Sequence, residues 1–222
     1  MTIRKVFRGI AAVTYASLAA AAGAAGAYRI DTLRHTPATE PVRVSGATES
    51  IGISSCQDIS RPGTYVLTRD LEAPAGSDCI KVLAAGVTLD LDGFSIRGTN
   101  SRAGAGINAN AAGADDFSAR NGAISGFWIG AVLKSGTIER LTIQNVGNGL
   151  YVGSGAVVGN RISAIHTGIQ VHSARVEANE IRSALSISCS VSCFASGNIV
   201  RGTDSAIAEA DGQAVTDDAA KL

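Results

Sequence analysis

Apolar residues recur in the second half of the chain at a constant interval of 19 residues. The longest series of this kind runs through Ile124, Ile143, Ile162, Ile181 and Val200. Other series keep the same interval: Ile138, Val157 and Val176; Leu133, Val152 and Val171; Leu150 and Ile169; Gly130, Gly149 and Gly168; and Asn160, Asn179 and Asn198. Because these series share one period, the pattern indicates an internal repeat.

Within each repeat, apolar and polar residues alternate over short runs, as in Ile169-Gln170-Val171. On a β-strand this alternation directs one set of side chains inward and the other outward. Residues that favour turns, mainly Gly, Asn, Ser and His, separate the runs. Three strands and three bends take about 19–22 residues, as one turn of a parallel β-solenoid does. The repeat therefore predicts an all-β, single-stranded solenoid.

The predicted solenoid has about seven turns over residues 60–207, which gives a rod roughly 30–35 Å long at about 4.8 Å per turn. Asn160, Asn179 and Asn198 are predicted to stack as an amide ladder at one bend. An α-solenoid is the competing interpretation, but it requires longer repeats and stronger helix formers. The repeats are instead rich in Gly, Ser, Ile and Val, which favours the β-solenoid.

The first 27 residues have the pattern of a signal peptide. Three basic residues, Arg4, Lys5 and Arg8, precede an uncharged apolar stretch over 10–22. The small residues at 25–27 suit signal peptidase, so cleavage is predicted after position 27. An uncleaved membrane anchor is the alternative, although the stretch is short for a span of about 20 residues.

These features predict four regions: a signal peptide (1–27), a flexible linker (28–50), a parallel β-helix domain (51–207) and an acidic C-terminal tail (208–222). The linker is assigned because it shows no periodicity. The mature protein is expected to be secreted, periplasmic or at the cell surface, with no membrane partner after cleavage.

Composition narrows the classes of partner. The 19 Lys and Arg residues balance 19 Asp and Glu residues, so the formal net charge is zero and binding to nucleic acid is not expected. Hydrophobic residues make up 45% of the chain, which excludes global disorder. Aromatic residues make up only 5%, which suits the narrow interior of a thin coil.

Export to an oxidising compartment makes the four cysteines potential disulfide partners. Cys56 and Cys79 bracket the first turn, and a disulfide is predicted between them. It would close a 24-residue loop and contribute about 3 kcal/mol in the chain-entropy description. Cys189 and Cys193 lie four residues apart across a possible bend. They are expected either to form a second disulfide or to stack, buried, on the coil axis.

The segment before the regular repeats contains the runs CQDI (56–59), PGTYVL (62–67), DL (70–71), CI (79–80) and VTLDLDGFSI (87–96). With the downstream repeats, these runs resemble bacterial right-handed parallel β-helix repeat proteins of the pectin-lyase-like superfamily over about residues 56–207. The resemblance implies a right-handed coil with three faces. It implies no single function, because the superfamily includes polysaccharide lyases, hydrolases, epimerases, phage fibres and adhesins.

Five residues are candidates for catalysis by a lyase or epimerase that acts on acidic polysaccharide: Asp90, Asp92, Asp115, Asp116 and Arg120. Asp90 and Asp92 share one face of a strand about 6–7 Å apart, where they could bind Ca²⁺ or transfer protons. A structural role in the turn that follows is the favoured interpretation. The resemblance implies that a Ca²⁺-dependent lyase needs several carboxylates and an arginine base, which Asp115, Asp116 and Arg120 could supply.

Two further sets of titratable residues have weaker patterns. Glu139 and Glu177 occupy equivalent positions two turns apart, about 9–10 Å, with Val158 between them. This separation is at the upper edge for an inverting carboxylate pair.

His166 and His172 have no Cys or carboxylate at metal-ligand spacing, so surface positions and no metal site are expected. The N-T-D, G-H-G and R-I-K motifs of the superfamily's glycoside hydrolases are absent, which weakens a hydrolase assignment.

Trp128, Tyr151 and Arg182 are the candidates for contact with a glycan or a cell-surface component. Packing of Trp128 under a loop at 98–116 is the alternative for that residue. The leading hypothesis is a secreted structural or carbohydrate-binding protein without catalysis and without a cofactor. The alternatives are the lyase or epimerase, which would use Ca²⁺, and a fibre-like oligomeric surface protein.

Overall fold

The computed structural model describes residues 49–99, 103–201 and 204–209, the last six by their backbone alone. All of them belong to one compact unit of the chain, Gly46–Leu222. The predicted signal peptide, nearly all of the predicted linker and most of the predicted acidic tail lie outside the described residues. No helix in the described part of the chain is long and apolar enough to cross a membrane.

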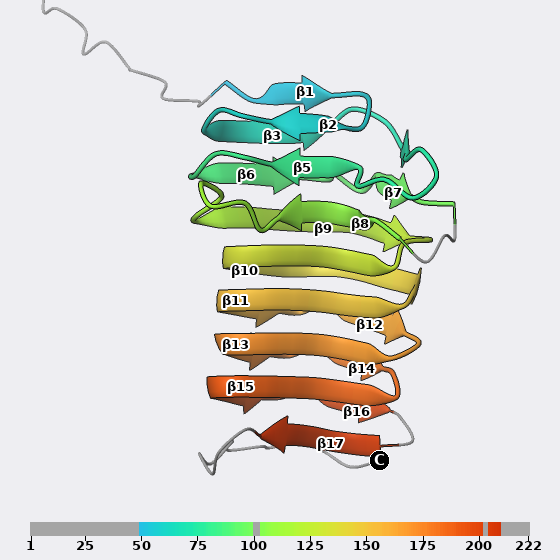
Figure 1. Cartoon of the computed structure of the whole chain (residues 1–222), viewed down its shortest axis with the longest axis vertical. Helices are drawn as coiled ribbons and strands as arrows, with labels where there is room; N and C mark the ends of the chain where they lie inside the picture. Colours follow the sequence, from blue (N-terminus) through green and yellow to red (C-terminus); the bar gives the residue numbers. More distant parts are fainter. Residues whose placement is uncertain (1–48, 100–102, 202–203, 210–222) are drawn as a thin grey trace, which may run out of the picture. The chain divides into compact units, whose positions relative to one another are not determined.

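The described residues form β-strands and no helix, which confirms the predicted all-β class. In chain order the strands are β1 (Ile51–Ile53), β2 (Gln57–Ile59), β3 (Gly63–Leu67), β4 (Leu71–Glu72), β5 (Ile80–Val82), β6 (Val87–Asp90), β7 (Ser95–Arg97), β8 (Ala105–Ala109), β9 (Phe117–Ser125), β10 (Ile129–Val146), β11 (Asn148–Val158), β12 (Arg161–Ala164), β13 (Thr167–Glu177), β14 (Glu180–Arg182), β15 (Leu185–Ser196), β16 (Ile199–Arg201) and β17 (Asp204–Glu209). They pair in parallel and stack on one another as one large sheet (Figure 1).

The pairings sort the strands into three faces. Face 1 contains β2, β5, β8, the first parts of β10, β11, β13 and β15, and then β17. Face 2 contains β1, β3, β6, the first part of β9, the middle of β10 and the second parts of β11, β13 and β15. Face 3 contains β4, β7, the end of β9, the end of β10, β12, β14 and β16. A chain that visits the three faces in turn is consistent with a parallel solenoid.

From β9 onward, the interval between most paired residues of neighbouring turns equals the period of the sequence repeat. Ile143 pairs with Ile124 before it and Ile162 after it, and Ile162 pairs with Ile181. Each of these four side chains is at most 1% exposed. The outward positions that flank Ile143 and Ile162 are polar: Thr142, Gln144, Arg161 and Ser163. Inward residues therefore pack on their equivalents in the neighbouring turns, as the alternation predicts.

The predicted amide ladder lies at the corner between faces 2 and 3. The Nδ2 of Asn160 donates to the Oδ1 of Asn179 at 3.0 Å, and the Nδ2 of Asn179 donates to the Oδ1 of Asn198 at 3.0 Å. The backbone N–H groups of Asn160 and Asn179 donate to the same oxygens. All three side chains are at most 2% exposed. The ladder supplies partners for backbone groups that the sheet leaves unpaired at the bend.

The same corner contains a left-handed residue in five successive turns. Asn121, Arg140, Gly159, Ala178 and Gly197 have φ angles between 52° and 65°. Glycine adopts this conformation without penalty, whereas side chains with a Cβ do so at a cost. The bend therefore requires a left-handed residue in each of these turns. Glycine, which adopts this conformation without penalty, occupies the position only at Gly159 and Gly197.

Glycines at a second repeated position allow adjacent turns to approach closely. A Cβ at Gly149 would overlap the carbonyl oxygen of Gly168 and the side chain of Ile162. Gly130 and Gly168 meet equivalent backbone and isoleucine atoms. The repeated glycine series thus reflects lack of space for a side chain.

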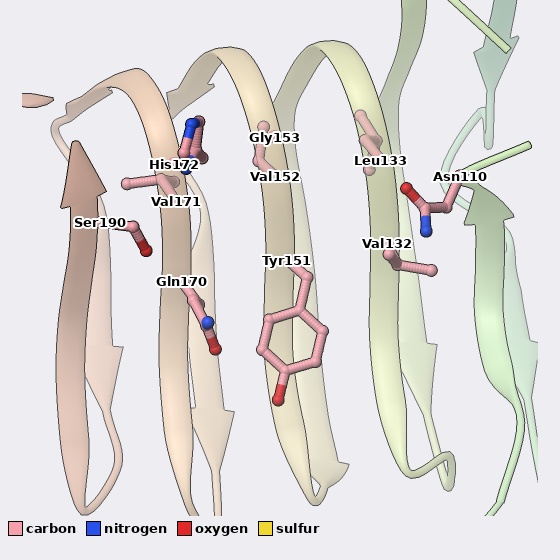
Figure 2. Close-up of a pocket in the computed structure, with 10 residues that line it drawn as sticks. All are labelled: Asn110, Val132, Leu133, Tyr151, Val152, Gly153, Gln170, Val171, His172 and Ser190. Carbon is pink, nitrogen blue, oxygen red and sulfur yellow. The ribbon is translucent and has the colours of Figure 1, made fainter. Parts of the chain in front are cut away.

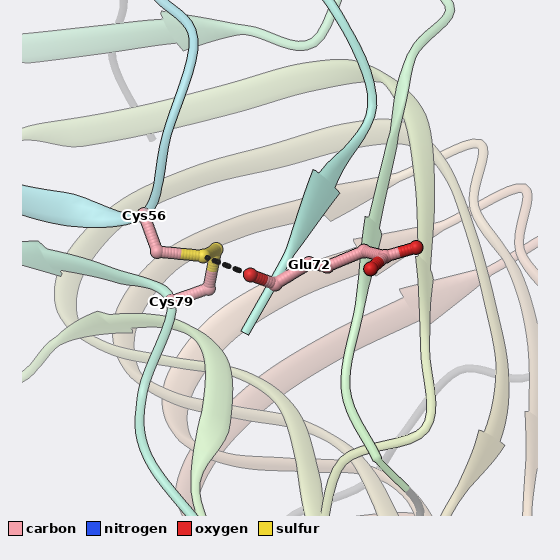
Figure 3. The surroundings of a disulfide bond; sticks show 3 residues. All are labelled: Cys56, Glu72 and Cys79. Atoms are coloured by element: carbon pink, nitrogen blue, oxygen red, sulfur yellow. Dashed lines mark hydrogen bonds between the residues drawn. A yellow bond between two sulfur atoms is a disulfide. The ribbon is translucent and has the colours of Figure 1, made fainter. Parts of the chain in front are cut away.

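Both predicted disulfides are present. Cys56 follows β1 and Cys79 precedes β5, so this bond joins successive turns, and the Cys56 Sγ contacts the carbonyl oxygen of Glu72 at 3.4 Å (Figure 3). The second bond joins Cys189 and Cys193 within β15. Of the two interpretations of the latter pair, the disulfide is confirmed.

Candidate functional site

The Asp90 carboxylate lies at the end of β6, beside the corner between faces 2 and 3. It accepts hydrogen bonds from the Arg120 Nε at 2.8 Å, from the Asn121 Nδ2 at 3.1 Å and from the backbone N–H of Asp92 at 3.0 Å. Partial burial raises the pKa of Asp90, but these three donors together outweigh it and leave the pKa below its usual value. Asp92 is itself left-handed, with a φ of 47°. The arrangement is that of a structural corner.

Asp115 and Asp116 have different partners. The Asp115 carboxylate lies 2.8 Å from the Lys134 Nζ and accepts a hydrogen bond from the Ser135 Oγ. The hydrogen bond from Lys134 is the largest influence that lowers the pKa of Asp115. Asp116 has a φ of 54° and donates its backbone N–H to the Ser135 Oγ at 3.1 Å. These contacts fasten the loop before β9 to β10.

The five candidates for lyase chemistry therefore fall into two separate groups. Arg120 is bonded to Asp90, while Asp115 is bonded to Lys134. In the part of the chain that the structure describes, no group of three or more His, Cys, Asp or Glu residues is placed to hold a metal ion.

Glu139 and Glu177 occupy the equivalent positions predicted for them, since both pair in register with Val158. Each carboxylate has an arginine neighbour: the Arg140 guanidinium lies 2.6 Å from Glu139, and the Arg175 Nε lies 3.5 Å from Glu177. A valine side chain lies between the two carboxylates on the outer surface. Both glutamates thus belong to surface ion pairs.

The three candidates for ligand contact lie on different elements. Trp128 precedes β10, and its ring meets that of His166 edge-on with centroids 5.4 Å apart. Arg182 is exposed at the end of β14 on face 3. Tyr151 lies on β11 on face 1. Only Tyr151 of these three lines the open groove on face 1.

Face 1 bears an open groove with a volume of about 530 Å³ (Figure 2). Val132, Tyr151 and Gln170 pair in register and form one outward row across β10, β11 and β13. Beside this row, a Cβ at Gly153 would overlap the carbonyl oxygen of Lys134, so the strands approach closely there. The lining residues are Asn110, Val132, Leu133, Tyr151, Val152, Gly153, Gln170, Val171, His172 and Ser190.

The groove offers an aromatic ring together with uncharged hydrogen-bonding groups. The amides of Asn110 and Gln170 and the hydroxyl groups of Tyr151 and Ser190 both donate and accept, and His172 adds an imidazole. Partial burial raises the pKa of Tyr151, so its hydroxyl stays protonated at neutral pH. Among the described residues, no carboxylate, lysine or arginine side chain lines the groove. Its chemistry suits an uncharged ligand rich in hydroxyl groups.

Sequence reasoning singled out Tyr151 but did not assign Asn110, Gln170 or Ser190 to a site. Gln170 follows Tyr151 by the repeat interval, so aligning the outward positions of the repeats would place these two side chains next to each other. His172 is exposed, as predicted, and also lines the groove. Asn110 and Ser190 fall where the interval is broken, which is why no repeat alignment finds them.

The chain matches no family model, no curated protein and no solved structure.

Proposed function

We propose that this chain is an exported, right-handed parallel β-helix protein of the pectin-lyase-like type that binds a neutral carbohydrate along the face 1 groove without processing it. The observation that supports the proposal is the combination of the Tyr151 ring with uncharged amides and hydroxyls in that groove.

The lining groups correspond to the two properties of a sugar surface. The apolar face of a pyranose ring packs on an aromatic ring, and Tyr151 presents one on the outer side of the sheet. Sugar hydroxyls donate and accept hydrogen bonds, as do the amides of Asn110 and Gln170. The groove also lies within the usual volume range of about 300–1,000 Å³ for small-ligand sites.

The positions and partners of the carboxylates favour a binding function over a catalytic one. Glycoside cleavage uses two carboxyl groups that flank the scissile bond, and the described residues that line the groove include none. Asp90, Asp115, Glu139 and Glu177 each have a cationic partner at the surface. The lyase or epimerase would require Asp90 and Arg120 to leave their mutual ion pair in order to act on substrate.

Export is supported by the disulfides. Four cysteines form two bonds, and disulfides persist mainly in extracellular or periplasmic compartments. A neutral glycan on the outside of a cell is a ligand available in that location. The family assignment, the handedness and the signal peptide form part of the same proposal.

The test is a binding screen of the purified chain on immobilised neutral and acidic oligosaccharides. Gln170→Ala should weaken binding to neutral glycans at least tenfold, because it removes an amide from the groove. Gln144→Ala is the matched control, since Gln144 is an exposed outward glutamine on face 3. Equal binding by both variants, or binding only to acidic glycans, contradicts the proposal.

A parallel assay addresses the enzymatic alternative. The chain is incubated with polygalacturonate and alginate, with Ca²⁺ and then with chelator, while absorbance of unsaturated products and reducing ends are followed. No product is expected. Product that depends on Ca²⁺ and is lost in Asp116→Ala would establish the lyase instead.

A further inference from the structure

The register of the sheet shifts beside the groove, between β13 and β15. The pairs that join β11 to β13 keep the repeat interval throughout, from Leu150–Ile169 onward. Between β13 and β15, however, the pairs Thr167–Leu185 and Val171–Cys189 fall one position short of it. The original interval returns at Ser173, which pairs with Ser192. One residue is therefore missing before β15, and one extra residue is present between Cys189 and Ser192.

The extra residue forms a β-bulge opposite a groove residue. Ser190 and Val191 together face the single residue His172 in β13. Both bulge residues are exposed, with Val191 at 50%. Bulges re-aim side chains and are common next to functional sites. Here the bulge places Ser190 beside His172 at one end of the groove (Figure 2).

The Cys189–Cys193 disulfide closes a short ring around this bulge. Cys189 precedes the two bulge residues and Cys193 follows them, both in β15. Cys189 is buried, whereas Cys193 is only partly buried. The bond connects no two turns of the coil, unlike Cys56–Cys79, which joins successive turns. Its position suits holding a local shape more than stapling the fold.

We infer that the Cys189–Cys193 disulfide clamps the bulge as the end wall of the groove, so that its reduction weakens ligand binding while the coil stays folded. The effect on binding rests on the proposed function, whereas the clamp does not. A dithiol reductant supplies the chemistry: one of its thiolates attacks one cystine sulfur and expels the other cysteine as a thiolate, and its second thiol then displaces the attacked cysteine from the mixed disulfide. Two electrons and two protons pass to the cysteines, and the reductant becomes a disulfide.

The experiment compares the full-length wild type with Cys189→Ser/Cys193→Ser by amide hydrogen exchange. Exchange over 168–173 and 186–193 should become at least tenfold faster in the variant, while exchange in the Asn160–Asn179 ladder stays unchanged. A cooperative thermal transition within a few degrees of the wild type is expected. Unchanged exchange around the bulge, or loss of the folded coil, overturns the clamp.

A second readout measures binding on an array of neutral oligosaccharides. The Cys189→Ser/Cys193→Ser variant should lose at least tenfold in signal. Cys56→Ser/Cys79→Ser is the matched control, which should melt at a lower temperature but keep the signal. If the wild type binds no glycan, the proposed function fails, and the exchange measurement still decides the clamp. Equal signals for wild type and bulge variant overturn the inferred effect on binding.

Discussion

The corner between faces 2 and 3 is built from charged side chains in its early turns and from buried amides in its later ones. Early in the coil, Asp90 binds Arg120 and Asn121, and the Asn121 Oδ1 in turn accepts a hydrogen bond from Arg140 at 2.9 Å. Later, Asn160, Asn179 and Asn198 bond to one another inside the coil. The same bend is thus stabilised by two different chemistries.

The spacing of the turns explains why the chemistry changes. In the early coil Tyr65 pairs with Leu89 and Leu89 pairs with Ala119, so these two turns differ in length from each other and from the later repeats. An amide ladder needs identical residues at identical positions in consecutive turns, which the constant interval of the later turns provides. Irregular turns place unlike residues side by side, so an ion pair takes the place of the ladder at this corner.

The largest expected effect comes from breaking the ladder at its centre. Asn179→Ala removes two donated hydrogen bonds and leaves the Asn160 N–H without its acceptor, while the Asn160 Nδ2 keeps the carbonyl oxygens of Ile138 and Val158. Unsatisfied buried groups cost about 1–3 kcal/mol each, so a loss of about 4 kcal/mol is expected in the free energy of unfolding. Urea denaturation measures it. Asn110→Ala is the exposed control; an equal loss there would contradict a special role for the ladder.

Breaking the charged corner should have a smaller effect. Asp90→Ala removes the acceptor of Arg120, Asn121 and the Asp92 N–H. Because hydrogen bonds to charged groups contribute about 1.5–3 kcal/mol and Arg120 remains partly in contact with water, a loss of about 2 kcal/mol is expected. Asp58→Ala, at an exposed position of β2, should change the same denaturation midpoint very little. Identical shifts for the two variants would count against the charged corner.

Lowering the pH should destabilise the charged part of the corner before it destabilises the amide ladder. The folded-state pKa of Asp90 is lowered, so its contribution to stability is fully present above the unfolded value of about 3.9 and is lost as pH falls further toward the folded value. The amide ladder does not titrate. Protection factors from hydrogen exchange, which correct for the slower intrinsic exchange in acid, should therefore fall below about pH 4 at 88–92 and 118–122 before they do at 160–179. Simultaneous loss of protection in both regions, or persistence of the early loss in Asp90→Ala, would refute this assignment.

The smallest expected effect is a gain in the free energy of unfolding. Ala178 is left-handed with a φ of 53°, at the position where Gly159 and Gly197 occupy the neighbouring turns. Ala178→Gly should stabilise the protein by about 1 kcal/mol, because glycine adopts this conformation without the Cβ penalty. Ala156→Gly, in the extended part of β11, should instead destabilise by about 0.5–1 kcal/mol. Thermal melting of the two variants should shift in opposite directions; the same direction would contradict the argument.

The regular turns could be predicted from the sequence because inward residues such as Ile143 and Ile162 pair at the period that the pattern shows. The Asn ladder followed from the same period. The contact of Arg120 with Asp90 could not, since the two residues belong to turns of irregular length that no period relates. The groove could not be predicted from the sequence either, because Asn110 and Ser190 line it from a loop and a bulge that break the repeat.

The proposed binding of a neutral carbohydrate on face 1 of the coil can be tested residue by residue. The most direct test is chemical-shift mapping of the isotope-labelled chain during titration with the neutral oligosaccharide that gives the strongest signal in the binding screen. The amides of Tyr151, Gln170 and His172 are expected to shift together, and Gln170→Ala should weaken the titration at least tenfold. Shifts centred on Asp90 and Arg120, on Trp128 or on Arg182, or no saturable shift with any oligosaccharide, would contradict it.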